Sequence, residues 1–420
     1  MSHPGGLSHS QSSVVALPWI LRLLACFQLL LMGCTWPLWL NSRHFPAVPL
    51  WSLPPMPEQL PAIISGLFSL ACLLLIFRTT RSTSDVTSSS ATAVWLPSLI
   101  LFTGLLLGCF NQHCLQAWHV FFLWAVASCL IRNSRYQLKA LRQLPACVYV
   151  CSGLSRLSLQ PEAGPTGMIL GQLTKFLPVD LQPQEADFRW LCHAAAWGEL
   201  SVGLLLLTRG PARWIGIVAA MLLHVALLVA LGPMGLNHSP AVLLWNVSFL
   251  LLLPLLFRES VQKPVAIASP ASASQRGRGT VMWAAWSCLL WCTSLGGLVG
   301  LTDNWSSWQL YSPRPEQWQL WIDRLYAGRV PYPFAAAVSG ASVDGLVAVR
   351  LDVASLRQTG SPLYPEDRFQ LALIRRILAG LPRHVRFRVR IDEPEGWRWW
   401  RRKVREVVDH ESLTREPTGN

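Results

Sequence analysis

Charged residues are scarce in this sequence of 420 residues. Asp, Glu, Lys and Arg make up only 14% of the chain, whereas average soluble domains carry about 25%. Hydrophobic residues make up 52%, and the mean hydropathy is +0.35. So few charges cannot cover the water-facing surface of a protein of this size, which excludes an ordinary soluble enzyme and a disordered chain. The composition predicts a multi-span membrane protein.

Redox, metal and nucleotide motifs are lacking as well. None of the eleven cysteines belongs to a CxxC motif, and all of them lie within or beside apolar runs. They are expected to be small apolar side chains rather than disulfide or zinc ligands. The sequence contains no glycine-rich phosphate loop, no HExxH and no GxSxG, which are the motifs of nucleotide-binding proteins, metalloproteases and serine hydrolases. No metal site is predicted.

Lysine is rare, and the position of the basic residues matters more than their number. Four lysines stand among 35 basic residues, and the net charge is +13. Residues 302–420 hold 18 basic and 14 acidic residues, a net +4, which leaves +9 for the first 301 residues. Most charges of that first part lie between apolar runs. They therefore predict the orientation of membrane spans and not binding to nucleic acid.

Nine segments are apolar and long enough for a membrane helix, which needs about 20 residues. They are residues 17–40, 61–77, 93–110, 113–131, 140–158, 190–208, 212–232, 239–257 and 280–301. Residues 1–16 are small and polar and are expected to be disordered. Residues 258–279, rich in Ala, Ser, Gln and Gly, are expected to form a linker before the last span.

The loops between these segments predict one orientation. Alternate loops carry most of the arginines, and Lys and Arg favour the cytoplasmic side of a membrane. The N-terminus is therefore expected in the cytoplasm. Because nine spans end on the opposite side, residues 302–420 are expected outside the cell.

The C-terminal region, residues 302–420, has a different pattern. Residues 384–391 (HVRFRVRI) alternate apolar residues with arginines, as a half-buried strand with one arginine face would. The segment 397–405 (WRWWRRKVR) follows. The arginine face either lies on anionic lipid headgroups or is a solvated sheet face, and an external location disfavours nucleic acid. The predicted fold is an all-α polytopic membrane bundle of about nine spans with a small C-terminal α+β extramembrane domain.

Four polar residues lie in four consecutive predicted spans: Arg156, Glu199, His224 and Asn246. Ionisable groups at membrane depth are costly and therefore suggest a functional site. We expect the four side chains to form a polar core in a dry interior. Glu199 and His224 are weak catalytic candidates, because such a pair can relay a proton. The alternative is a structural ion pair that fixes how the helices pack.

A second polar cluster lies where the third predicted span meets the fourth. It comprises Asn111, Gln112, His113, Gln116, Trp118 and His119. Amide and aromatic side chains are typical of the membrane–water interface. The cluster therefore predicts either an interface belt or the mouth of a site.

Residues 140–257 resemble the four-helix unit of DoxX/MauE-type membrane proteins. The segment 147–157 (CVYVCSGLSRL) is similar to the first helix of that family, with Arg156 where the family usually has lysine. The segment 198–205 (GELSVGLL) resembles its second helix, and residues 213–257 resemble the third and fourth. The resemblance implies an accessory protein of a redox or envelope-associated complex in the bacterial cytoplasmic membrane. Such a protein often works with a quinone or a partner enzyme.

The longer layout also resembles HTTM proteins, the relatives of vitamin K-dependent carboxylase membrane domains. The segment 111–118 and the helix at 149–156 carry this likeness. It implies a quinol-linked membrane enzyme, in which Glu199 or His224 would be the base because no lysine lies inside a predicted span. Two functions thus follow from the sequence: a non-enzymatic membrane accessory protein and, as the alternative, a quinol-linked enzyme.

Overall fold

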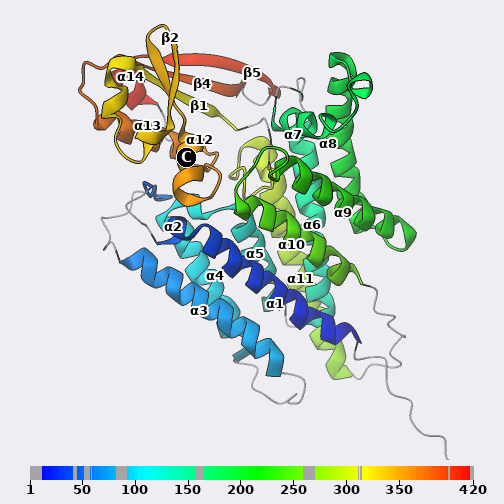
Figure 1. Cartoon of the computed structure of the whole chain (residues 1–420). Coiled ribbons are helices and arrows are strands. Elements are labelled where there is room, and N and C mark those ends of the chain that lie inside the picture. The colour runs from blue at the N-terminus through cyan, green and yellow to red at the C-terminus, as the bar shows by residue number, and fades with distance from the viewer. Residues whose placement is uncertain are drawn as a thin grey trace, which may run out of the picture.

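The computed structural model shows a helical bundle with a small sheet domain at one of its ends (Figure 1). It describes residues 12–40, 45–51, 57, 59–81, 92–131, 133–157, 162, 164–258, 270–310, 312, 315–395 and 398–416. Residues 1–11 of the predicted disordered start and 259–269 of the predicted linker lie outside the described residues. The helix α1 begins at Ser12 and the helix α11 begins at Pro270, inside the ranges predicted as disordered and linker.

Six helices are long and apolar enough to cross a membrane. They are α1 (Ser12–Cys34), α3 (Leu60–Arg81), α8 (Glu185–Leu207), α9 (Pro211–Leu231), α10 (Pro240–Phe257) and α11 (Pro270–Gly296). These helices confirm a multi-pass membrane protein. Three further helices complete the bundle: α4 (Thr92–Phe110), α5 (Ala117–Ala127) and α6 (Ser134–Arg156). The predicted count of nine spans is not confirmed, because the apolar stretches Val94–Phe110 and Ala117–Leu130 are shorter than the other six and the first half of α6 is polar.

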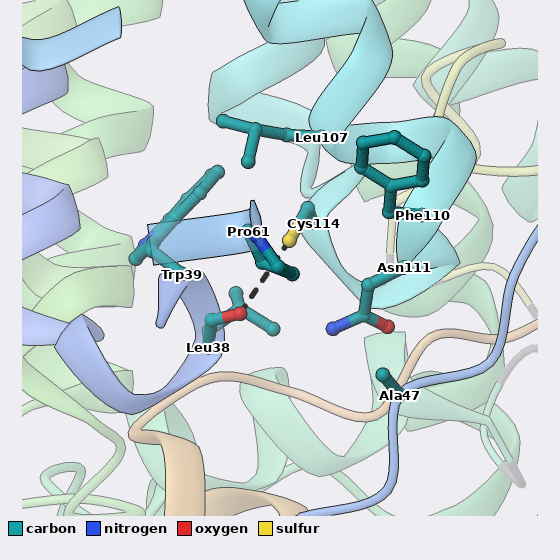
Figure 2. A pocket seen from close by; sticks show the side chains of 8 residues that line it. All are labelled: Leu38, Trp39, Ala47, Pro61, Leu107, Phe110, Asn111 and Cys114. Atoms are coloured by element: carbon teal, nitrogen blue, oxygen red, sulfur yellow. Dashed lines mark hydrogen bonds between the residues drawn. The ribbon is translucent and has the colours of Figure 1, made fainter. Parts of the chain in front are cut away.

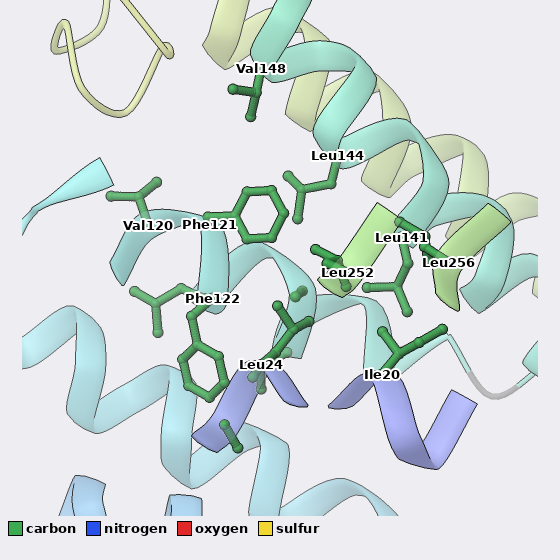
Figure 3. Packing of buried hydrophobic residues seen from close by; sticks show 14 of the residues in the cluster. Ile20, Leu24, Val120, Phe121, Phe122, Leu141, Leu144, Val148, Leu252 and Leu256 are labelled. Carbon is green, nitrogen blue, oxygen red and sulfur yellow. The ribbon is translucent and has the colours of Figure 1, made fainter. Parts of the chain in front are cut away.

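The interior of the bundle is filled by side chains from helices that are far apart in sequence. Leu24 of α1, Phe121 of α5, Leu144 of α6 and Leu252 of α10 meet in one buried cluster (Figure 3). Apolar contact inside a membrane is set by close packing rather than by exclusion of water. The cluster therefore holds the bundle together by fit between its side chains.

Glycines allow α6 and α8 to approach each other very closely. A Cβ atom at Gly153 would lie 2.6 Å from the backbone nitrogen of Leu200, and one at Gly203 would lie 2.7 Å from that of Val150. Small residues at a crossing let two helix backbones come together. This contact brings the C-terminal end of α6 against the middle of α8.

The domain sits on the bundle end at which α6 and α11 finish (Figure 1). At the other end, Arg142 near the start of α6 donates from Nε to the Leu256 carbonyl of α10, over 2.8 Å. The Thr280 hydroxyl of α11 donates there to the Tyr136 hydroxyl, over 2.6 Å. The two ends of the bundle therefore differ. One end carries the domain, and at the other end helices begin with turns that contain basic residues.

Five antiparallel strands form the sheet of the domain, in the order β2-β3-β1-β4-β5. They are β1 (Gln317–Asp323), β2 (Val338–Val343), β3 (Leu346–Val349), β4 (Phe387–Glu395) and β5 (Arg398–Val407). Helix α13 (Asp367–Ala379) packs on one face, and α12 (Leu351–Thr359) and α14 (His410–Arg415) complete the domain. The prediction of a small α+β region at the C-terminus is confirmed.

The arginine face of β4 is turned away from the bundle. Phe387, Val389 and Ile391 are buried against α13, and Arg388 and Arg390 point to the opposite face of the sheet. Helices α12 and α13 both touch the bundle and so lie on its side of the sheet. This arrangement favours the solvated-face interpretation over contact of these arginines with headgroups of the same membrane.

Candidate functional site

A buried ion pair joins α6 to α8. Arg156 Nη1 lies 2.7 Å from Glu199 Oε2, and the side chains are only 8% and 7% exposed. At this distance the two opposite charges attract each other strongly in the dry interior. Arg156 also donates from Nε and Nη2 to the backbone carbonyl of Leu310, over 3.2 Å each. One guanidinium thus connects the interior of the bundle with the segment that leads into the C-terminal domain.

A second polar contact joins α6, α9 and α10. The Asn246 amide donates from Nδ2 to the Val242 carbonyl over 2.8 Å, which leaves Asn246 Oδ1 facing His224 Nδ1 at 2.8 Å. Nδ1 must then carry the proton, and Nε2 accepts from the Tyr149 hydroxyl over 2.6 Å. Phe249 stacks on the imidazole with ring centroids 4.6 Å apart. These partners suit a neutral His224 whose Nε2 accepts a hydrogen bond from a phenol.

The four predicted core residues all face inward, but they form two contacts rather than one. Tyr149 and Arg156 are seven residues apart on α6, so they share a helix face and lie about 10 Å apart along the axis. Sequence reasoning missed Tyr149. Its spacing from Arg156 was a usable signal, since a residue seven positions away on a helix projects in the same direction.

Replacing Tyr149 by phenylalanine is expected to lower the free energy of unfolding by about 1–3 kcal/mol, because Nε2 of the buried His224 would lose its donor. Tyr326→Phe is the matched control. Its hydroxyl also lies 2.6 Å from a histidine nitrogen, on His384, but that contact is exposed to water. Thermal unfolding in detergent checks both variants, and equal effects of the two would show that burial adds nothing to the Tyr149 contact.

Four residues of the predicted boundary cluster form a buried joint between the bundle and the domain. Gln112 Oε1 accepts from Arg368 Nε of α13 over 2.8 Å. His113 donates from Nε2 to the Pro362 carbonyl over 2.9 Å, and Gln116 Nε2 donates to the His113 carbonyl, also over 2.9 Å. The Asn111 side chain accepts from the His113 backbone nitrogen over 3.2 Å. These side chains pair with protein groups in the structure.

The other two residues of that cluster lie inside the bundle. His119 Nδ1 is 3.0 Å from the Gln28 amide nitrogen, and its Nε2 is 3.2 Å from the Gly104 carbonyl oxygen. Trp118 is buried against Leu31 and Ala241. The six residues therefore lie in two places: Trp118 and His119 inside the bundle, and the other four at its end.

A small pocket lies beside this joint (Figure 2). Its wall includes Leu38, Trp39, Leu107, Phe110 and Cys114, and the Cys114 thiol faces the Leu38 carbonyl at 3.5 Å. The cavity has a volume of about 20 Å³, room for about one water molecule. The pocket is thus too small for a substrate molecule. Among the described residues, no group of three His, Cys, Asp or Glu could hold a metal ion.

On the domain side of the joint, a carboxyl group is held away from water. Glu366 Oε1 accepts from the Asn304 backbone nitrogen over 2.7 Å and from its side chain over 3.0 Å. Burial and, after it, the negative charge of Asp303 raise the pKa of Glu366 to about 7 against the opposing effects of Asn304 and Arg368. Asp303 in turn accepts from Tyr364 and pairs with Arg368.

The domain joint is expected to weaken as the pH rises from about 4.5 to about 7. The unfolded chain loses the Glu366 proton near the ordinary pKa of 4.5, whereas the folded chain keeps it until about 7. The stability that comes from the protonated carboxyl is therefore complete at low pH and is lost above pH 7. Glu366→Gln keeps the oxygen acceptor but has no proton to lose. Its stability should therefore decrease less between pH 5 and pH 7.5 than that of the wild type. Melting temperatures of both proteins at pH 5 and pH 7.5 check it, and parallel curves would contradict the assignment.

No family model, curated protein or solved structure matches this chain.

Proposed function

We propose that this chain is an accessory membrane protein of a redox or envelope-associated complex, of the DoxX/MauE type, in the bacterial cytoplasmic membrane. The observation that carries the proposal is the position of Arg156. Its guanidinium is paired with Glu199 inside the bundle and bound to the Leu310 carbonyl at the entrance to the domain. A buried charge used in this way holds an extramembrane domain in a fixed position, which is what a protein that supports a larger complex requires.

The proposal includes nine membrane crossings with the N-terminus in the cytoplasm and the domain outside. The contacts at the bundle ends support it, because α6 ends at the domain and begins at the opposite end. Arg135, Lys139, Arg142 and Arg213 all lie on helices that start at that opposite end. Lys and Arg mark the cytoplasmic side. A periplasm-dependent reporter fused after residue 420 should be active, and a cytoplasm-dependent one should be silent.

Purification of the intact chain from its native membrane tests the accessory role. We expect a redox subunit to co-purify in a fixed ratio, recognisable by the absorbance of a haem, flavin or iron–sulfur group. The chain alone, with no such absorbance in any mild detergent, would contradict the proposal. A co-purified quinone without a subunit would favour the alternative.

The alternative is a quinol-linked membrane enzyme, and the 2.6 Å contact between Tyr149 and His224 favours it. A quinol is itself a phenol, so an imidazole that accepts from a tyrosine hydroxyl has the chemistry to accept from a quinol hydroxyl. Glu199→Gln and His224→Ala separate the two functions. If both variants keep their membrane abundance and lose quinone binding or quinone-dependent activity, the chain is an enzyme. If both only lose abundance, the residues are structural.

A further inference from the structure

An apolar loop lies exposed between helix α7 (Pro165–Thr174) and α8. In residues 176–181, Phe176 is 55% exposed, Leu177 43%, Val179 86% and Leu181 63%. The loop has internal hydrogen bonds: the Leu177 nitrogen donates to the Thr174 carbonyl over 3.0 Å, and the Leu181 nitrogen donates to the Pro178 carbonyl over 2.9 Å. The outward direction of these side chains is therefore fixed by the backbone. We call residues 176–181 the apolar loop.

The packing register places this loop on the side of the bundle that carries the C-terminal domain. Gly153 of α6 faces Leu200 of α8, and Gly203 of α8 faces Val150 of α6, so the two helices are antiparallel. In this register Trp197 lies opposite Arg156, where α6 ends. Helix α8 then continues for about 12 residues, or about 18 Å, beyond α6 towards the domain side. The apolar loop immediately precedes this extension.

The side chains of α8 mark where the bilayer ends. Trp190 is 73% exposed and Trp197 is 56% exposed. Before Trp190, the first turns of the helix carry Glu185, Asp187 and Arg189. A tryptophan between a lipid-facing surface and a charged end is typical of the interface of a membrane. The loop lies between these charged turns and α7, whose Ile169 packs against Ala230 and Leu231 at the last turn of α9.

We propose that the apolar loop inserts into the interface of the leaflet on the side of the C-terminal domain, with phospholipid as its partner. Three features support lipid. The exposed side chains of the loop are apolar, the exposed Trp190 marks an interface position on the adjoining end of α8, and Lys175 at the end of α7 and Asp180 within the loop can remain at headgroup level. Inserted in this way, the loop anchors the protruding end of α8 and fixes the tilt of the helix that carries Glu199.

Photo-crosslinking in nanodiscs of phosphatidylcholine tests the proposal. The full chain would carry p-benzoyl-phenylalanine at position 179, with position 181 as a second site. Position 222 is the positive control, because Leu222 is 64% exposed in the middle of α9. Position 325 is the negative control, because Leu325 is 87% exposed on the C-terminal domain. Size-exclusion chromatography would first establish that each labelled chain is monodisperse.

We expect mass spectrometry to find a phospholipid adduct at 179 and 181 in a yield comparable to that at 222, and none at 325. Adducts at 222 without adducts at 179 and 181 would overturn the proposal. The proposal would also be overturned if, in native membranes, positions 179 and 181 crosslinked to a protein and not to a phospholipid. The inference depends on the membrane assignment and not on the redox role. If the membrane assignment were wrong, position 222 would also give no lipid adduct, so the two failures can be told apart.

Discussion

Replacing Arg156 by methionine is expected to lower the free energy of unfolding by about 3–5 kcal/mol, the cost of leaving one charge of a buried ion pair without its partner. Glu199 is 7% exposed, so water cannot replace the guanidinium. The Leu310 carbonyl would also lose both of its donors from Arg156. Unfolding with a denaturing detergent, followed by tryptophan fluorescence, measures this loss.

Two further proteins make this prediction specific. In Arg156→Met combined with Glu199→Leu, most of the stability should return, because an apolar pair of similar volume replaces the two charges. Arg350→Met is the matched control. Arg350 also lies 2.7 Å from a carboxylate, that of Asp352, but the two side chains are 59% and 50% exposed, and such pairs contribute about 0–1 kcal/mol. Equal losses in Arg156→Met and Arg350→Met would show that the buried pair carries no special role.

A methyl group at either glycine of the α6–α8 crossing is expected to lower the stability by about 1–3 kcal/mol, as overpacking of a tight interface does. In Gly203→Ala the added carbon would lie 2.7 Å from the Val150 backbone nitrogen, and in Gly153→Ala it would lie 2.6 Å from that of Leu200. Backbone atoms cannot swing aside as a side chain can, so the helices must separate. That separation would also pull Glu199 away from Arg156.

Gly198 provides the control for these variants, because it lies on the same helix with nothing within 4 Å of an added Cβ atom. Gly198→Ala is expected to be neutral or slightly stabilising, since alanine favours a helix over glycine. The same denaturing titration compares the three proteins. A loss in Gly198→Ala as large as that in Gly203→Ala would show that the effect does not come from the close approach of α6 and α8.

Particular residues show what the sequence can predict here. The scarcity of charge predicts the membrane class, and the alternation in residues 384–391 predicts a strand with Phe387 and Val389 inside and Arg388 outside. Glu199 and His224 are predicted to face the interior because a polar group inside a membrane needs a partner. Each of these inferences uses only residues that are close in the sequence and whether a side chain faces an apolar or a polar environment. Each can therefore be made without knowing the tertiary contacts.

Other features depend on contacts that no local pattern encodes. The Leu310 carbonyl that binds Arg156 is a backbone group outside any motif. The boundary residues Gln112 and His113 bind a protein domain, yet the same polar side chains would suit a headgroup layer, so their composition cannot distinguish the two. The span count also depends on tertiary contacts, because the polar first turns of α6 suit both a segment outside the bilayer and one that lines the bundle.

The central claim is that the buried Arg156–Glu199 pair holds the C-terminal domain in place. Hydrogen–deuterium exchange of the intact chain in nanodiscs tests this claim most directly, at residues 303–310, where the Gln309 nitrogen donates to the Asn304 carbonyl over 2.8 Å. If the claim is correct, Arg156→Met will speed exchange in this segment and Arg350→Met will leave it unchanged. Exchange in residues 303–310 that is the same in wild type and Arg156→Met would contradict it.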